Sequence, residues 1–166
     1  MDISFFSNDY TVRRMEKADV ADIYLLCSKN GLYYQYCPPF VTEQSILDDM
    51  KALPPNKETC DKYYVGYYKG EELIAVMDFI MAYPNEKTAF IGFFMTAVST
   101  QNAGIGSSII DDLCRYLASI RLSSVRLGWV KGNPQAEHFW HKNNFKETGI
   151  TYDTDNYTVV VAQRVL

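Results

Sequence analysis

A pair of glycines stands where an apolar run of the chain gives way to a helical pattern, and this junction restricts the fold more than any other stretch. Residues 101–108 read QNAGIGSS, and residues 93–98 before them read FFMTAV. Glycine accepts positive φ angles and lets another group approach the backbone closely. A strand, a glycine turn and a helix in this order therefore predict a turn that meets a ligand.

Apolar residues recur at helical spacing after this turn and predict an amphipathic helix of about four turns. They are Ile105, Ile109, Ile110, Leu113 and Leu117. The elements expected beyond this helix are a buried strand at 125–130, a helix at 135–143, a strand at 157–165 and a candidate extra strand at 148–152. Pro134 is well placed to lead into the second of these, because proline suits the first turn of a helix.

The first half of the chain predicts helices and strands in a similar mixture. The expected elements are a strand at 10–15, helices at 19–29 and 43–53, a hairpin at 62–83 and a strand at 88–98. Asp19 and Thr42 are the expected N-caps, and Gly31 is expected to end the first helix. Residues 31–40, GLYYQYCPPF, are expected to form an aromatic loop.

Composition is consistent with one globular domain over residues 1–166. Apolar residues make up 48% of the chain, which argues against disorder, and the length suits a single core. The alternation of helical and strand-like segments without a linker or repeat predicts an α/β or α+β fold. In this fold a mixed sheet carries helices on both faces.

Several classes of protein are disfavoured by charge and hydropathy. The formal net charge is −4 without a basic block, so we expect no nucleic-acid partner, whereas a small cationic ligand is favoured. No run approaches the roughly 18 apolar residues of a membrane span, so no membrane partner is expected. The opening MDISFFSNDY lacks the pattern of a signal peptide, and the expected location is the cytoplasm.

Neither the cysteines nor the histidines predict a metal site. Four cysteines are too scattered for a CxxC motif and are expected to be reduced and mostly buried. His138 and His141 lie three residues apart, but no third ligand accompanies them. We therefore expect no metal.

The glycine turn can be compared with other phosphate-binding motifs. A dinucleotide-binding fold needs a third glycine where Ile109 stands, and a Walker loop needs a lysine that this stretch lacks. Outward-pointing N–H groups at the start of a helix still make an anion site suited to a pyrophosphate. The alternative is a plain tight turn without a ligand.

The stretch from Phe93 to Gly149 resembles the GNAT family of acyl-CoA-dependent N-acyltransferases. The family's pyrophosphate loop, Arg/Gln-x-x-Gly-x-Gly/Ala, corresponds to Gln101, Gly104 and Gly106. Its second signature, an Asn, an Ala, an aromatic pair and a Phe, corresponds to NPQAEHFWHKNNF at 133–145. The resemblance implies a mixed, mostly antiparallel sheet of six to seven strands, splayed between the fourth and fifth strands and flanked by about four helices.

The resemblance also implies acetyl-CoA as the cofactor, held by the splayed strands and the glycine loop. The implied cofactor-binding residues are Met95, Thr96, Ala97, Val98, Gln101, Asn102, Ala103, Gly104, Ile105, Gly106, Ser107, Asn133, Phe139 and Trp140. Backbone groups of Met95 to Val98 are expected to pair with the pantetheine as an added strand would. Asn102 and Asn144 replace family glycines, which the tolerance of Asn for the left-handed region allows.

The general acid of the family has no direct counterpart in this chain. The family commonly places a tyrosine where Trp140 stands, and an indole N–H donates a hydrogen bond but is not a usable acid. His141 is a neighbouring candidate, although adjacent helical residues point about 100° apart. Tyr33, Tyr34 or Tyr36 could supply the proton and line the acceptor site, or solvent could protonate the thiolate.

Asp78 is the candidate base or ammonium binder. It interrupts the apolar run LIAVMDFIM, where a charge is costly unless it is paired or faces a cavity. The alternative is a structural partner for a cation or a backbone group.

The prediction is an N-acetyltransferase that acts on a primary amine of a small molecule or peptide by direct attack, as a monomer or homodimer. The alternatives are a non-catalytic acyl-CoA-binding sensor and an enzyme that uses a different phosphate-bearing cofactor. The acceptor and the use of other acyl groups stay open.

Overall fold

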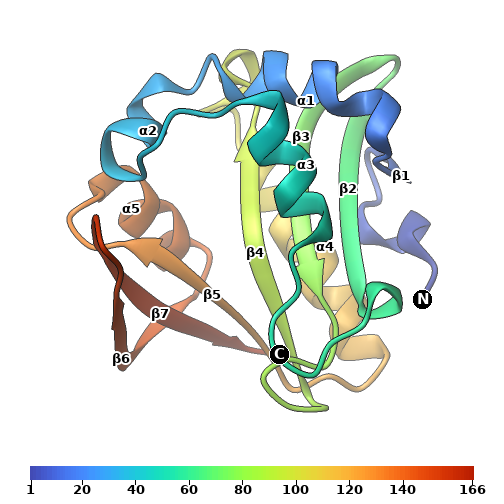
Figure 1. The fold of residues 1–166 in the computed structure, drawn as a ribbon. Coiled ribbons are helices and arrows are strands. Elements are labelled where there is room, and N and C mark those ends of the chain that lie inside the picture. Colours follow the sequence, from blue (N-terminus) through green and yellow to red (C-terminus); the bar gives the residue numbers. More distant parts are fainter.

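The computed structural model describes residues 1–166, which form one seven-stranded sheet between layers of helices (Figure 1). The strands follow the order β1-β2-β3-β4-β5-β7-β6. Their bounds are β1 Thr11–Arg14, β2 Lys62–Lys69, β3 Glu72–Ile80, β4 Thr88–Thr96, β5 Ser124–Val130, β6 Lys146–Asp153 and β7 Thr158–Val165. Only β4 and β5 pair in parallel, and the other neighbours are antiparallel. This confirms the predicted mixed, mostly antiparallel sheet.

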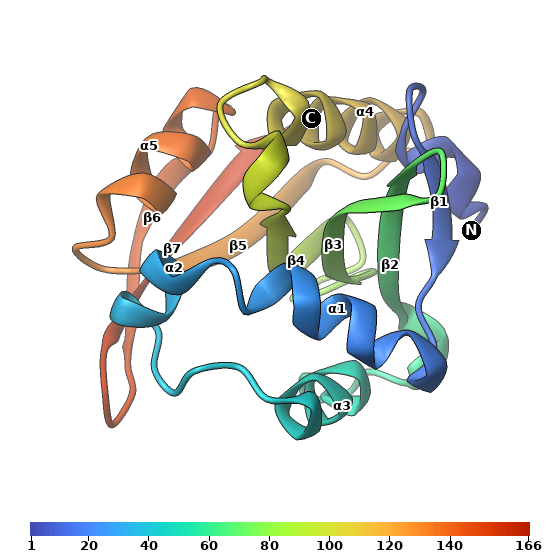
Figure 2. The ribbon, with the colours of Figure 1, turned by 90° about the horizontal axis from the view of Figure 1, so that it is seen from above.

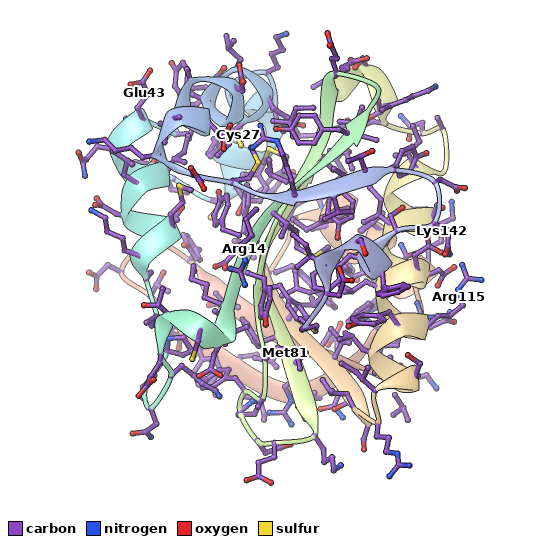
Figure 3. The ribbon with its side chains drawn as sticks, turned by 90° about the vertical axis from the view of Figure 1, so that its right-hand side faces the viewer. Arg14, Cys27, Glu43, Met81, Arg115 and Lys142 are labelled. Atoms are coloured by element: carbon purple, nitrogen blue, oxygen red, sulfur yellow. The ribbon has the colours of Figure 1, made fainter.

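Five α-helices cover the two faces of the sheet (Figure 2). Their bounds are α1 Val20–Cys27, α2 Gly31–Tyr36, α3 Glu43–Lys51, α4 Ile105–Ser119 and α5 Pro134–Lys142. Helices α1 and α3 lie on one face, and α4 and α5 lie on the other. Figure 3 shows this division, with Cys27 and Glu43 on one side of the sheet and Arg115 and Lys142 on the other.

The apolar stripe of α4 forms the centre of the larger core. Ile109, Ile110, Leu113 and Leu117 are fully buried against the sheet, as their helical spacing predicted. Burial of each such side chain contributes about 2 kcal/mol relative to exposure. Helix α4 is therefore fixed on one face of the sheet, and it begins shortly after β4 ends.

Two helix starts follow their sequence signals closely. Asn133 caps α5, because its side chain accepts a hydrogen bond from Ala136 N at 3.1 Å, and Pro134 occupies the first turn. Thr42 caps α3 and accepts from Ser45 N at 3.0 Å. Asp19 stands at the N-cap position of α1, but its side chain makes no cap bond to that helix; its carboxylate instead accepts from Glu16 N at 2.7 Å, at the end of a short 3₁₀ turn at Lys17–Asp19.

The structure corrects two expectations about local structure. Residues 31–36 form the helix α2 instead of a loop, and Gly31 begins that helix after α1 has already ended at Cys27. The candidate strand at 148–152 is part of the longer edge strand β6. Asn102 and Asn144 have φ angles of 61° and 64°, which confirms that Asn takes the left-handed conformation at both positions.

No helix of the structure is both long and apolar enough to pass through a lipid bilayer.

Candidate functional site

The sheet opens between its two parallel strands. The pairing of β4 with β5 runs from Thr88↔Ser124 to Ile91↔Leu127 and stops there, although both strands continue. On the other side of β4, the register with β3 shifts by one residue at Asp78, so Gly92 is an extra residue in β4. Such a bulge bends its strand and interrupts the ladder, which explains why β4 leaves β5 at this point.

A pocket of about 500 Å³ occupies the opening. It is lined by β4 and β5, by the glycine turn and first residues of α4, by α5, by α2 and by the turn between β6 and β7. A volume of this size is typical of sites for organic ligands. The opening in the sheet is therefore also a candidate binding site.

Backbone groups of β4 alternate between β3 and the pocket. Ala97 N donates to Ile74 O at 2.8 Å, so Ala97, and Met95 two residues earlier, direct their backbone groups toward β3. Phe94 and Thr96 are turned the other way, toward the opening left by β5. The residues from Met95 to Val98 were expected to offer backbone groups to a ligand. Among them, Thr96 directs its backbone groups toward the pocket, whereas the N–H of Ala97 is already bonded to Ile74 of β3.

The two glycines of the turn have different roles. Gly104 has a φ angle of 81° and precedes α4, and nothing stands within 4 Å of the position that a Cβ would take there. A Cβ on Gly106 would lie only 3.1 Å from the ring of Phe139, so this glycine allows α4 and α5 to pack closely. Sequence reasoning attributed both glycines to ligand approach, whereas the second one also leaves room for the Phe139 ring.

The start of α4 presents unpaired donors to the pocket. The first bond of the helix is Ser108 N to Gly104 O at 3.0 Å, which leaves the N–H groups of Ile105, Gly106 and Ser107 without partners in the helix. These residues line the pocket. Together with the positive end of the helix dipole, they form a site suited to an anionic group.

Asn30, which follows α1, fixes the glycine turn to the sheet. Gln101 Nε2 donates to Asn30 Oδ1 at 2.7 Å, and Asn30 Nδ2 donates to Thr96 O at 3.3 Å. Asn30 lines the pocket, and sequence reasoning missed it because its partners are 66 and 71 residues away. The Gln101 side chain therefore holds the loop in place from inside the pocket wall.

An aromatic cluster closes the pocket on the α5 side. Trp140 packs against Phe94, Phe139 and Phe145, with ring centroids 6.1, 4.9 and 5.1 Å away. Only 8% of Trp140 is exposed, and both Trp140 and Phe139 line the pocket. The indole is thus a core residue that also forms part of the pocket wall.

Most of the cofactor-binding residues expected from sequence come together at this pocket. Those that line it are Met95, Thr96, Gln101, Asn102, Gly104, Ile105, Gly106, Ser107, Asn133, Phe139 and Trp140. Ala97, Val98 and Ala103 do not line it. Of the candidate acceptor tyrosines, Tyr33 lines the pocket, whereas Tyr34 and Tyr36 do not.

His141 lies outside the pocket. Its Nε2 is 3.7 Å from Glu147 Oε1, and its ring meets the edge of Trp129 at 5.4 Å. It is His138 that lines the pocket from α5. No group of three His, Cys, Asp or Glu side chains is arranged to hold a metal ion.

Asp78 lies beside the bulge, next to the pocket wall. Its Oδ2 accepts from Lys62 Nζ at 2.8 Å, and its buried Oδ1 has no hydrogen-bond partner. A Cβ on Gly92 would stand 2.8 Å from Asp78 Oδ2, and Gly92 itself lines the pocket. Burial raises the pKa of Asp78, and the Lys62 ammonium opposes this shift. Asp78 is therefore both an ion-pair partner and a neighbour of the opening.

Two segments distant in sequence meet at the pocket beside α2. Cys37, which follows α2, donates its thiol to Tyr157 Oη at 3.5 Å, and Tyr157 precedes β7. Both residues line the pocket, together with Tyr33. The hydrogen bond with Cys37 raises the pKa of Tyr157 to about 12, and burial raises the pKa of Tyr33 well above its usual value. Both hydroxyls are therefore protonated at neutral pH.

Comparison with protein families matches residues 29–145 to the acetyltransferase (GNAT) family. The match spans more than half of the chain and includes the glycine turn, the opening of the sheet and α5. A comparison with curated protein sequences finds no match.

Solved structures with the same fold include three acetyltransferases. One from Thermus thermophilus has a TM-score of 0.74 at 15% identity, covering 95% of this chain and 97% of that one. A spermidine N-acetyltransferase from Vibrio cholerae, in complex with CoA and spermine, has a TM-score of 0.67 at 17% identity, covering 96% of both chains. A ribosomal-protein-alanine N-acetyltransferase from Brucella melitensis has a TM-score of 0.64 at 12% identity, covering 93% of this chain and 99% of that one. At these identities the likeness concerns the fold.

Proposed function

Since the chain belongs to the acetyltransferase (GNAT) family and is an acetyl-CoA-dependent N-acetyltransferase, we propose that it acetylates a primary amine of a small molecule or peptide by direct attack. The observation that carries this proposal is the opening between β4 and β5, which joins an anion site to a side lined by Tyr33 and Tyr157. The relatives of known structure are named for different amines, so they support the reaction and not one acceptor.

The residues of the pocket suit the diphosphate and the pantetheine arm of acetyl-CoA. The N–H groups of Ile105, Gly106 and Ser107 suit its diphosphate, because they are unpaired and aimed from a helix start. The backbone groups of Phe94 and Thr96 suit the amides of the pantetheine arm, which would take the place that β5 leaves. The thioester would then approach the bulge at Gly92.

Catalysis would depend on placing the amine against the thioester in this closed space. A backbone N–H of β4 that faces the opening, such as that of Phe94, would donate to the carbonyl oxygen as negative charge develops there. The amine nitrogen forms a bond with the carbonyl carbon, and the bond from that carbon to sulfur breaks. Holding both groups in line supplies much of the acceleration in reactions of this kind.

Asp78 would take the proton that the amine loses, directly or through water. Its Oδ1 is buried without a hydrogen-bond partner, its Oδ2 is the oxygen nearest to Gly92, and burial raises the pKa of the carboxyl. The missing side chain at Gly92 brings the carboxylate to the pocket wall. The departing thiolate would take a proton from solvent, since Trp140 has no acidic proton to give.

Tyr157 would serve as a hydrogen-bond donor on the acceptor side and not as a strong acid. Its raised pKa of about 12 keeps the hydroxyl protonated. A hydroxyl that stays protonated can donate a hydrogen bond to the acceptor.

The experiment that tests the proposal follows the release of free thiol from acetyl-CoA in the presence of a panel of primary amines. Saturable, amine-dependent release is the expected result. Binding of acetyl-CoA without release would instead support a non-catalytic sensor. A rise in melting temperature with a dinucleotide, but not with CoA, would point to a different cofactor.

A further inference from the structure

Asn30 stands at the corner between α1 and α2, beside the end of β4 (Figure 2). It is half-buried and lines the pocket. Its backbone turns the chain from one helix to the next, because Asn30 N donates to Cys27 O at 3.0 Å and Asn30 O accepts from Tyr33 N at 3.0 Å. Although Asn30 is the N-cap of α2, its side chain makes no cap bond to that helix and is left to bond elsewhere.

The side-chain amide of Asn30 bonds to three separate parts of the chain. Its Oδ1 accepts from Gln101 Nε2 at 2.7 Å. Its Nδ2 donates to Leu26 O at 3.1 Å and to Thr96 O at 3.3 Å. Leu26 belongs to the last turn of α1, Thr96 is the last residue of β4, and Gln101 begins the glycine turn. One side chain therefore joins a helix, the sheet and the glycine turn.

Asn30 and Gln101 together occupy the carbonyl of Thr96. Gln101 Nε2 lies 3.5 Å from Thr96 O, and Asn30 Nδ2 lies 3.3 Å from it. Because Thr96 faces the opening that β5 leaves, this carbonyl would otherwise accept from a ligand that pairs along β4. The ladder that such a ligand can form therefore ends before Thr96 O, and it can use the Thr96 N–H and the backbone groups of Phe94.

The glycine turn is held at both of its ends. Helix α4, which follows Gly104, is buried in the larger core. At the other end, the side-chain amide of Gln101 bonds to Asn30 and Thr96. Without the Asn30 side chain, Gln101 would keep only the longer of these two contacts. The position of the N–H groups at the start of α4 relative to β4 thus depends on Asn30.

We propose that Asn30 is a positioning residue for acetyl transfer: through Gln101 and the carbonyl of Thr96 it fixes the start of α4 relative to β4, so that a cofactor held by its diphosphate presents its thioester at Gly92. This inference rests on the proposed function and adds a residue to its machinery. Asn30 acts through its two partners and not on the reacting atoms. Since α2 begins at the same residue, the cofactor is also positioned relative to the acceptor side of the pocket.

The first experiment measures the Kd for CoA by calorimetric titration in a double-mutant cycle. Asn30→Ala and Gln101→Ala are each expected to weaken binding about fivefold to tenfold, because a loosened turn must be ordered when the ligand binds. If Asn30 acts through Gln101, the double variant should bind within about twofold of the weaker single variant. Independent residues would instead give a combined loss of roughly 25-fold to 100-fold.

Asn143→Ala is the matched control for the loss of a helix-end bond. Asn143 Nδ2 donates to the carbonyl of Phe139, four residues earlier, at 2.8 Å, as Asn30 Nδ2 does to that of Leu26. Asn143 is buried and does not line the pocket. We expect Asn143→Ala to lower the melting temperature at least as much as Asn30→Ala does, but to leave the Kd for CoA within about twofold of the wild type.

A second variant at the same position covers the case in which Asn30→Ala does not fold. Serine is a good N-cap, so Asn30→Ser keeps a favourable start for α2. Its side chain is too short to bond to Gln101 and Thr96 together, so its Kd for CoA should rise as that of Asn30→Ala does. Melting temperatures show which variants are folded.

The second experiment measures kcat by thiol release from acetyl-CoA, with an acceptor taken from the amine panel. With both substrates saturating, Asn30→Ala is expected to lower kcat about fivefold or more, because a misplaced thioester reacts slowly even when it is bound. Asn143→Ala should keep kcat within about twofold, since a lost helix-end bond does not move the thioester.

The outcomes separate this inference from the proposed function. The inference is overturned, while acetyl transfer stands, by additive changes of Kd in the cycle, by equal changes of Kd in Asn30→Ala and Asn143→Ala, or by an unchanged kcat in Asn30→Ala. A wild-type protein that binds no CoA, or that releases no thiol with any amine, overturns the proposed function and the inference with it.

Discussion

The change Asp78→Asn tests whether the buried ion pair of the sheet serves stability, chemistry or both. Lys62 Nζ donates to Asp78 Oδ2 at 2.8 Å and to Ala52 O at 2.9 Å, and only 4% of the Lys62 side chain is exposed. Asn keeps an oxygen at the same place but removes the negative charge. Lys62 would then be a buried cation without a counter-ion.

The loss of stability follows from this burial. Removing one partner of a buried pair costs about 3–5 kcal/mol. We expect the lower end, about 3 kcal/mol, since the carbonyl of Ala52 and the amide oxygen of Asn still accept from the ammonium. For a domain of 166 residues each kcal/mol shifts the melting temperature by about 2–4 °C, so the expected fall is about 6–12 °C.

The assay combines calorimetry with steady-state kinetics at neutral pH. Turnover at saturating amine is expected to fall by about a hundredfold if the carboxylate takes the proton. The Kd for acetyl-CoA should change by less than about twofold, because the start of α4 is unaffected. As a control, the double variant Lys62→Met with Asp78→Leu should recover most of the stability but none of the turnover.

Two results would refute this reasoning in separable ways. A melting temperature of Asp78→Asn within about 2 °C of the wild type would show that Lys62 does not depend on the charge of Asp78. An unchanged kcat at saturating amine would remove Asp78 from the mechanism and leave it a structural partner of Lys62.

Three further predictions concern the cofactor loop, acid stability and the missing acid. Gly104→Ala should weaken the binding of acetyl-CoA about tenfold, because the φ angle of 81° costs an alanine about 1–2 kcal/mol. Calorimetric titration measures this affinity, and an unchanged Kd would contradict the role of this turn. Burial raises the pKa of Asp112, but hydrogen bonds from Asn8 and Arg115 outweigh it and hold the pKa below its usual value. The stability that these bonds provide is therefore present above about pH 4 and is lost as the pH falls through the lowered pKa of Asp112. The difference in melting temperature between the wild type and Asp112→Asn should shrink as the pH falls below about 4. Trp140→Phe should destabilise the core by about 1–3 kcal/mol but leave kcat within about threefold, and a loss of turnover beyond tenfold would give the indole N–H a role in the chemistry.

Local signals in the sequence were sufficient for most of the fold. The stripe from Ile105 to Leu117 predicted α4 and its buried face, and Asn133 with Pro134 marked the start of α5. Each of these signals lies within one or two turns of the chain. The aromatic segment at 31–36 shows no amphipathic spacing, so the sequence does not predict a helix there. Tyr33 of this helix contacts Phe93 of β4, and this contact helps to stabilise it.

The cofactor side of the candidate site was more predictable than the acceptor side. The turn with Gln101, Gly104 and Gly106 is contiguous in sequence and carries a motif. The acceptor side depends on Cys37 and Tyr157, which are 120 residues apart in the sequence. The bulge at Gly92 also had no signal, because a single glycine in a strand does not reveal the register of its neighbour.

The position of β7 has a consequence for the biosynthesis of this protein. Although β7 is the last of the seven strands, it lies between β5 and β6 (Figure 1), and Tyr157 stands at its beginning. A nascent chain that has emerged only as far as β6 has an uncovered edge on β5 and lacks one side of its pocket. Until β7 has paired with β5, that open edge is a site where the nascent chain can misassemble.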